Sequence, residues 1–127
     1  MNIPEDLRYS SDHEWVRRSG SRLTIGITDY AQDALGDVVY LEVPSSGAAV
    51  SAGERISEVE STKSVSDIFA PVDGSVVEVN ENLGSNPELV NQDPYGAGWI
   101  CVIDIGSDES GWDALLDADA YRALIVE

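Results

Sequence analysis

Short segments in which apolar and polar residues roughly alternate run along most of the chain, separated by Gly, Pro, Asn and Asp. This alternation is typical of β-strands with one buried face, and the frequent turn residues limit the strands to a few residues each. The pattern therefore predicts a mainly β domain. The expected strands cover residues 14–18, 23–27, 38–42, 55–60, 66–69, 75–79 and 99–105.

Two helices are expected outside the strands. Residues 28–36 begin with Thr28 as a candidate N-cap, continue with Asp29 in the first turn and end at Gly36, a pattern that predicts a short helix. Near the C-terminus, Ser110 can cap a second helix that packs on the β core through one apolar face. That face would hold Trp112, Leu115, Leu116, Ala120 and Leu124. Residues 83–98 contain two prolines and three glycines and are expected to form a long ordered loop.

Length and composition indicate a single domain spanning residues 1–127. A hydrophobic fraction of 43% is sufficient for one core. The 24 Asp and Glu residues outnumber 7 Lys and Arg, for a net charge of −17, which argues against nucleic acid or anionic lipid as a partner. The longest apolar run, residues 99–103, is far too short to span a membrane, and the first residues lack a targeting pattern.

The single cysteine, Cys101, excludes an internal disulfide and a CxxC site, and indicates a reducing compartment. A Cys101–His13 nucleophile pair has no third orienting motif, so we expect Cys101 to be a packed strand residue and His13 a structural or interface residue. No metal site is expected. The bacterial cytoplasm fits these features.

Six of the seven basic residues are arginine, and Lys63 is the only lysine. A lysine amine can form an amide with a carboxylic acid, and an arginine side chain cannot substitute for lysine in this reaction. Lys63 is flanked by Ser61, Thr62 and Ser64 between two expected strands, so its amine should lie in water at the tip of a hairpin. This arrangement suits a protein that carries a prosthetic arm. From the count alone, however, depletion of lysine by composition, with one solvated lysine left on a hairpin of an acid-rich chain, is the simpler explanation.

The residues around Lys63 resemble those of lipoyl and biotinyl carrier domains. The core of the pattern is residues 60–63, Glu-Ser-Thr-Lys, with Pro71 and Gly74 downstream. The flanking sequences resemble, more specifically, the lipoyl-bearing H-protein family of the glycine cleavage system, and this resemblance spans nearly the whole chain. The flanking segments are residues 13–16, 26–32 and 35–37, Asn91, and residues 94–99.

The resemblance implies a barrel-sandwich fold of the lipoyl-type hammerhead class and a carrier protein rather than an enzyme. Lipoate would be joined to Lys63 as an amide, and its dithiolane would accept the aminomethyl group of glycine. The implied partners are glycine decarboxylase (P protein), aminomethyltransferase (T protein), dihydrolipoamide dehydrogenase (L protein) and a lipoate-attaching enzyme. Glu14 and Asp67 match family positions that line the arm cleft, and Asp12 stands where some relatives have a hydroxyl residue.

Other carrier classes remain as alternatives. A lipoyl domain of a 2-oxoacid dehydrogenase would share the hairpin but lack residues 13–15, residues 26–32 and the terminal helix. A biotin carrier usually flanks its lysine with methionines, whereas Thr62 and Ser64 stand here. An H-like protein that donates lipoate to 2-oxoacid dehydrogenases, or a plain interaction module, also fits the sequence.

Overall fold

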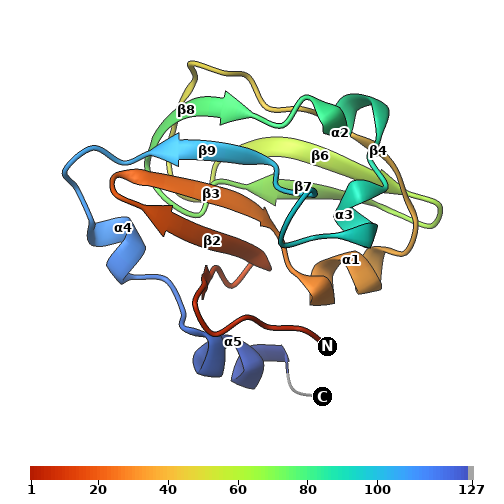
Figure 1. Ribbon diagram of the computed structural model, residues 1–127, viewed down its shortest axis with the longest axis horizontal. Coiled ribbons are helices and arrows are strands. Elements are labelled where there is room, and N and C mark those ends of the chain that lie inside the picture. Colours follow the sequence, from red (N-terminus) through yellow and green to blue (C-terminus); the bar gives the residue numbers. More distant parts are fainter. Residues whose placement is uncertain (126–127) are drawn as a thin grey trace.

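Two antiparallel β-sheets form the body of the molecule in the computed structural model, which describes residues 1–125 (Figure 1). The larger sheet has the strand order β1-β2-β3-β9-β8-β5, and the smaller has the order β4-β6-β7. The strands are β1 (Arg8–Tyr9), β2 (Glu14–Ser19), β3 (Arg22–Ile27), β4 (Val38–Leu41), β5 (Ala49–Val50), β6 (Arg55–Ser61), β7 (Val65–Phe69), β8 (Gly74–Val79) and β9 (Cys101–Asp104). The helices are α1 (Asp29–Leu35), α2 (Asn82–Ser85), α3 (Leu89–Gln92), α4 (Ser110–Asp113) and α5 (Ala118–Ile125).

The main core lies between the two sheets, where alternate residues of each strand point inward. Leu23 and Ile25 of β3 and Ile103 of β9 are fully buried there and pack in the same cluster as Val59 of β6 and Ile68 of β7. The predicted mainly β fold is confirmed, and all seven expected strands are present with ends shifted by at most two residues. The expected barrel-sandwich takes the form of an open sandwich, because the strands within residues 1–125 make two separate sheets and do not close into a barrel.

Helix α1 forms where the sequence predicts it. The Thr28 hydroxyl accepts a hydrogen bond from the Ala31 N–H at 3.2 Å, as an N-cap does. The chain leaves the helix at Gly36, whose φ of 79° favours glycine. The helix connects the large sheet to β4 in the small sheet, so it covers one end of the sandwich (Figure 1).

Residues 83–98 are more regular than the loop that we expect from the sequence. They contain α3 and most of α2, each a single turn, with Leu83 and Val90 buried in the core. Asn91 joins this segment to its neighbours: its amide donates to the Gly36 carbonyl at 2.9 Å, and its carbonyl accepts from the Val38 N–H at 2.9 Å. The two buried apolar side chains and this amide order the segment in spite of its prolines and glycines.

The prediction of one C-terminal helix from Ser110 is wrong, because the segment forms two helices, α4 and α5. Between them, Leu116 is extended and exchanges two backbone hydrogen bonds of 2.8 Å with Tyr9. The Asp117 carboxylate then accepts from the Ala120 N–H at 2.8 Å and starts α5. The break also rotates the second helix relative to the expected apolar face, so that Leu124 is 49% exposed and Tyr121 is buried instead.

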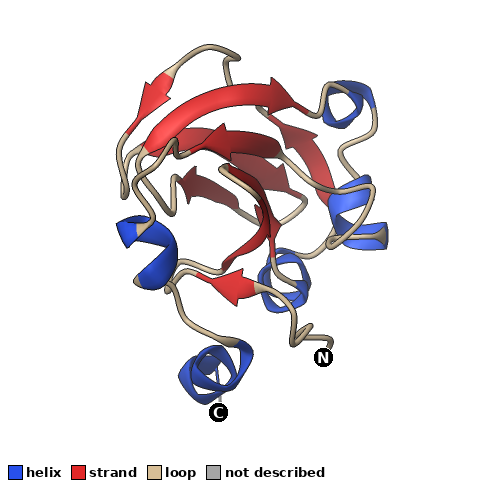
Figure 2. Ribbon diagram, turned by 60° about the vertical axis from the view of Figure 1, so that its left-hand side comes forward, coloured by secondary structure: helices blue, strands red, loops and turns tan. Residues whose placement is uncertain are grey.

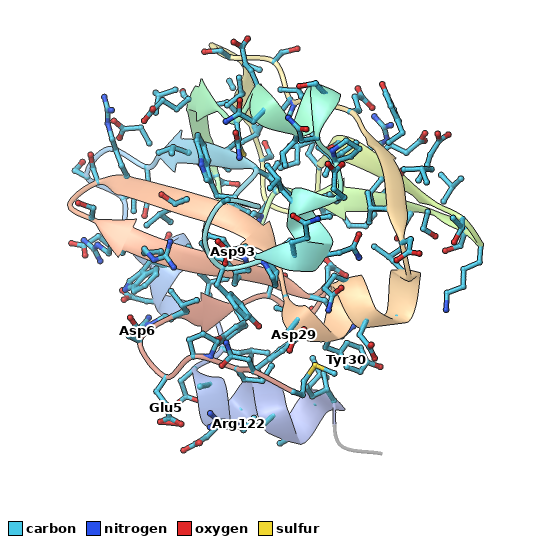
Figure 3. The ribbon with its side chains drawn as sticks, turned by 45° about the vertical axis from the view of Figure 1, so that its right-hand side comes forward. Glu5, Asp6, Asp29, Tyr30, Asp93 and Arg122 are labelled. Carbon is cyan, nitrogen blue, oxygen red and sulfur yellow. The ribbon has the colours of Figure 1, made fainter. Side chains whose placement is uncertain are left out.

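Helix α5 packs below the sandwich, beside the N-terminal segment (Figure 2). A second apolar cluster there includes Tyr9, Trp15 and Tyr121. Arg122 of α5 lies beside Glu5, with Nη1 and Oε1 at 2.6 Å, and also donates to the Ile3 carbonyl (Figure 3). These contacts fix both ends of the described chain near β1 and β2. None of the helices described is long and apolar enough to cross a membrane.

Candidate functional site

The turn between β6 and β7 presents Lys63 at one end of the molecule, the right-hand end in Figure 1. The Ser61 N–H donates to the Ser64 carbonyl at 2.8 Å, which closes the turn. The Ser61 hydroxyl accepts from the backbone N–H groups of Lys63 at 3.3 Å and Ser64 at 3.1 Å. The Thr62 N–H donates to the Asp37 carbonyl at 3.0 Å. The backbone of the turn is therefore held on both sides, as we expect for a tip that presents one side chain.

The Lys63 side chain leaves this turn along Gly36. A Cβ atom at Gly36 would lie only 3.1 Å from Lys63 Cε, so glycine leaves room here for the lysine stem as well as allowing the positive φ. Within residues 1–125, no carboxylate oxygen lies within 4.0 Å of Lys63 Nζ. The amine is exposed and unpaired with these groups, as the sequence predicts.

A cleft of about 340 Å³ lies beside the hairpin. Its walls come from the start of β7, from α1 and from the turn between β1 and β2, so three segments far apart in the sequence meet there. Its lining includes Asp12, His13, Glu14, Tyr30, Val65 and Asp67. The cleft thus starts next to the turn that carries Lys63 and contains both carboxyl groups that the sequence analysis selected, together with Asp12.

Glu14 is the buried carboxyl group of this cleft, with 1% of its surface exposed. The Ser10 hydroxyl donates to Oε1 at 2.5 Å, and the Phe69 N–H lies 3.4 Å from Oε2. Burial removes water from the carboxylate and raises the pKa of Glu14 to about 7, although both hydrogen bonds oppose this shift. Glu14 is therefore expected to titrate near neutral pH rather than in the usual acidic range of a carboxyl group. A cation entering the cleft would favour its ionised form.

Asp67 lines the same cleft but its carboxylate has a different environment. Arg55 Nε lies 3.0 Å from Asp67 Oδ1, and the same guanidinium also contacts Glu42 at 2.8 Å and Glu58 at 3.4 Å. The Asp67 side chain is 44% exposed. Glu14 and Asp67 thus both line this cleft, and of these two only Glu14 has no cationic partner among the described residues.

Sequence reasoning missed Ser10 and Arg55, the partners that set the state of the two carboxyl groups. The Ser10–Glu14 contact depends on the β1–β2 turn, and no local motif indicates it. Arg55 and Asp67 lie on two adjacent expected strands, so a cross-strand ion pair between them could have been anticipated.

Cys101 is a packed strand residue, as predicted. It lies in β9 with no exposed surface. Burial raises the pKa of its thiol to about 12, so the nucleophilic thiolate is absent near neutral pH. A Cys–His nucleophile is therefore not supported.

Comparisons with known proteins agree on one family. The family model described as "Glycine cleavage H-protein" matches residues 7–127. The glycine cleavage system H protein of Mycobacterium tuberculosis (strain ATCC 25618 / H37Rv) is 55% identical over 132 residues, which covers 99% of this chain and 98% of that protein. The H protein of Mycobacterium avium (strain 104) is 56% identical over 130 residues, with the same coverage.

A solved structure supports the same assignment. The crystal structure of a glycine cleavage system H protein from Mycobacterium marinum superposes with a TM-score of 0.83 at 41% identity and covers 95% of this chain and 97% of that one. Sequence and fold thus agree over nearly the full length. The chain belongs to the glycine cleavage H-protein family.

Proposed function

We propose that this chain is the lipoyl carrier of the glycine cleavage system, a single carrier domain of residues 1–127 without catalytic residues of its own that works in the bacterial cytoplasm. Lipoate is attached to Lys63 through an amide bond. The observation that carries this proposal is the position of the only lysine, which lies exposed at the tip of the β6–β7 hairpin beside a cleft with a buried carboxyl group.

The residues around Lys63 fit an amide-linked arm. An attaching enzyme needs an accessible amine, and the Lys63 amine is exposed. Its backbone is held by the Ser61 hydroxyl and, through Thr62, by Asp37. Loss of the positive charge on amide formation breaks no ion pair among the described residues, so the modification leaves the hairpin intact. The absence of a second lysine makes the reaction selective for this position.

The arm supplies a dithiolane that accepts the aminomethyl group of glycine at glycine decarboxylase, delivers it to aminomethyltransferase and is reoxidised at dihydrolipoamide dehydrogenase. The chain itself contributes the tether and the cleft. Tethering makes each encounter at a docked partner effectively intramolecular. We propose that the cleft shelters the cationic cargo between visits, with Glu14 as its principal carboxylate and Asp67, which Arg55 already neutralises in part, as a secondary one.

The negative charge of the chain supports docking to basic surfaces on the partner enzymes. Acidic residues surround the hairpin tip, including Asp37 at its side, Glu58 and Glu60 on β6, and Asp67 on β7. Such a field speeds the encounter with a basic partner and orients it toward Lys63. The same charge disfavours nucleic acid and anionic membranes as partners.

Exchange of labelled bicarbonate into the carboxyl group of glycine tests this function, because it requires a loaded carrier and glycine decarboxylase together. The wild-type chain, lipoylated by a lipoate ligase, should support exchange, whereas the Lys63→Arg variant treated in the same way should not. Lys63→Arg keeps a positive charge at the hairpin tip and is therefore a matched control. Equal exchange with the variant, or none with a chain shown to be lipoylated, would contradict the proposal.

A further inference from the structure

The hydroxyl group of Tyr121 makes two contacts that link the C-terminal helix to the cleft. Tyr121 is fully buried on α5, and its ring stacks on Tyr9 with centroids 4.7 Å apart. Its oxygen lies 2.8 Å from Thr28 Oγ1 and 2.8 Å from His13 Nδ1. Thr28 is the N-cap of α1, a helix that lines the cleft, and His13 lines the cleft itself, so one hydroxyl joins α5 to both segments.

The surroundings of Thr28 set the direction of these hydrogen bonds. Thr28 has no exposed surface, and its Oγ1 already accepts the Ala31 N–H as the N-cap of α1. Within residues 1–125, Tyr121 is the remaining partner of the Thr28 hydroxyl and hence the acceptor for its hydrogen. Tyr121 then donates its own hydrogen to His13 Nδ1. The reverse direction would leave a buried hydroxyl hydrogen without an acceptor, which is unfavourable.

An Nδ1 atom that accepts a hydrogen bond carries no proton. We propose that Tyr121 is a positioning residue of the cleft, because its hydroxyl holds His13 as the neutral tautomer with the proton on Nε2, the ring nitrogen that remains for the contents of the cleft. The role of the cleft itself rests on the function proposed above. The backbone of His13 supports a specialised position, since its φ of 71° is unusual for a residue other than glycine.

A fixed neutral imidazole suits a cleft that receives a cation. A charged imidazolium would repel cationic cargo and compete with it for the carboxylates. Burial lowers the pKa of His13, while the neighbouring charge of Asp12 acts in the opposite direction. The His13 ring also lies against Tyr30, with centroids 4.9 Å apart. The titratable groups around His13 are Asp12 and Glu14 from its own segment, Tyr30 from α1, Asp67 from β7 and Tyr121 from α5.

Nitrogen NMR of the full-length chain measures this tautomer directly, because His13 is the only histidine and its ring signals need no assignment. In the unlipoylated wild type at pH 7.5 or so, we expect Nε2 to carry the proton and Nδ1 to show the shift of a hydrogen-bonded acceptor. Tyr121→Phe keeps the ring that stacks on Tyr9 but removes the hydroxyl. In this variant the ratio of the Nε2–H to the Nδ1–H tautomer should fall about fivefold, which is the change in equilibrium expected when one net hydrogen bond is lost.

Tyr95→Phe is the matched control. The Tyr95 hydroxyl also makes two hydrogen bonds, accepting from the Asp29 N–H at 2.9 Å and donating to the Asn2 carbonyl at 2.6 Å, but it does not contact His13. This variant should lose stability without changing the tautomer. A wild-type proton on Nδ1, or a tautomer ratio that Tyr121→Phe leaves unchanged, would overturn the proposal. If Tyr121→Phe does not fold, the wild-type Nδ1 signal decides, because an Nδ1 without the shift of a hydrogen-bonded acceptor would also overturn the proposal. No step needs the arm, so the proposed function is tested separately.

Discussion

The folded structure raises the pKa of the Glu14 carboxyl group. Its pKa lies at about 7 in the folded chain, against an ordinary value near 4.5, because burial disfavours the charged form. The folded state therefore binds more protons than the unfolded state between these two values. The contribution of Glu14 to the free energy of unfolding therefore falls as the pH rises through this window and is constant above it. At pH 8, ionisation of the buried Glu14 lowers the free energy of unfolding by at most about 3 kcal/mol.

Replacing Glu14 by glutamine removes this pH dependence, because the amide is neutral throughout. We expect the free energy of unfolding of Glu14→Gln, relative to wild type, to increase by up to about 3 kcal/mol between pH 4 and pH 8. Urea unfolding followed at several pH values measures the difference. Glu78→Gln, at an exposed position of β8, is the control and should follow the wild type. A constant difference between Glu14→Gln and wild type across the range would exclude a raised pKa.

The sequence is informative about Lys63 and less so about its surroundings. Lys63 can be recognised because it is the only lysine and because small hydroxyl residues flank it. Glu14 and Asp67 stand out only through the family resemblance, since nothing else in the sequence distinguishes them from the other acidic residues of this chain. The contact of Ser10 with Glu14 depends on the conformation of the β1–β2 turn, which no local motif indicates, whereas the pairing of Arg55 with Asp67 could have been anticipated from their places on adjacent expected strands.

The pairing of β2 with β3 depends on a glycine. Gly26 lies opposite Trp15 in the sheet, and a Cβ atom at Gly26 would lie 2.5 Å from Trp15 Cε2. The indole cannot move aside freely because it is fully buried and donates to the Pro94 carbonyl at 2.8 Å. Gly26→Ala should therefore destabilise the chain by about 1–3 kcal/mol, as overpacking does.

Thermal unfolding of Gly26→Ala against Gly84→Ala checks this expectation. At Gly84, in α2, the nearest heavy atom to a new Cβ is 3.8 Å away, so there is room for it, and alanine also favours the helix. Gly84→Ala should be neutral or slightly stabilising. Equal melting temperatures for the two variants would show that Trp15 does not fill the space above Gly26.

Helix α5 begins at a side-chain cap that a single substitution can remove. The Asp117 carboxylate accepts from the Ala120 N–H. Asp117→Ala should lower the free energy of unfolding by about 1 kcal/mol, whereas Asp117→Asn, which keeps an acceptor, should lower it much less. Chemical denaturation measures both values. If alanine and asparagine had the same effect, the hydrogen bond would not be what stabilises the start of α5.

Elements with a strong local pattern were predictable and those formed by long-range pairing were not. The strands β2 and β3 alternate clearly, and α1 carries its caps in the sequence. By contrast, β1 and β5 have two residues each and exist only through their partners β2 and β8. The C-terminal helix is interrupted because Leu116 pairs with Tyr9, more than one hundred residues away. The spacing of apolar residues within 110–124 does not indicate this pairing with Tyr9.

The whole molecule has a net charge of −17, and this charge should govern how fast it meets its partners. The KM of glycine decarboxylase for the lipoylated chain should rise about tenfold between about 0.02 M and 0.3 M salt, because salt screens exposed charges. Steady-state kinetics of the exchange reaction measure this. Glu60→Gln, beside the hairpin turn, should raise the KM more than Glu78→Gln on β8. A KM independent of salt would rule out electrostatic docking.

The central claim is that Lys63 carries a lipoyl group, and the mass of the protein purified from its native host tests it most directly. Intact mass measurement followed by peptide mapping should show one lipoyl increment, confined to the peptide that contains Lys63 and absent from Lys63→Arg. A biotinyl increment at Lys63 would contradict the cofactor. An unmodified Lys63 that a lipoate ligase also leaves unmodified would contradict the carrier function itself.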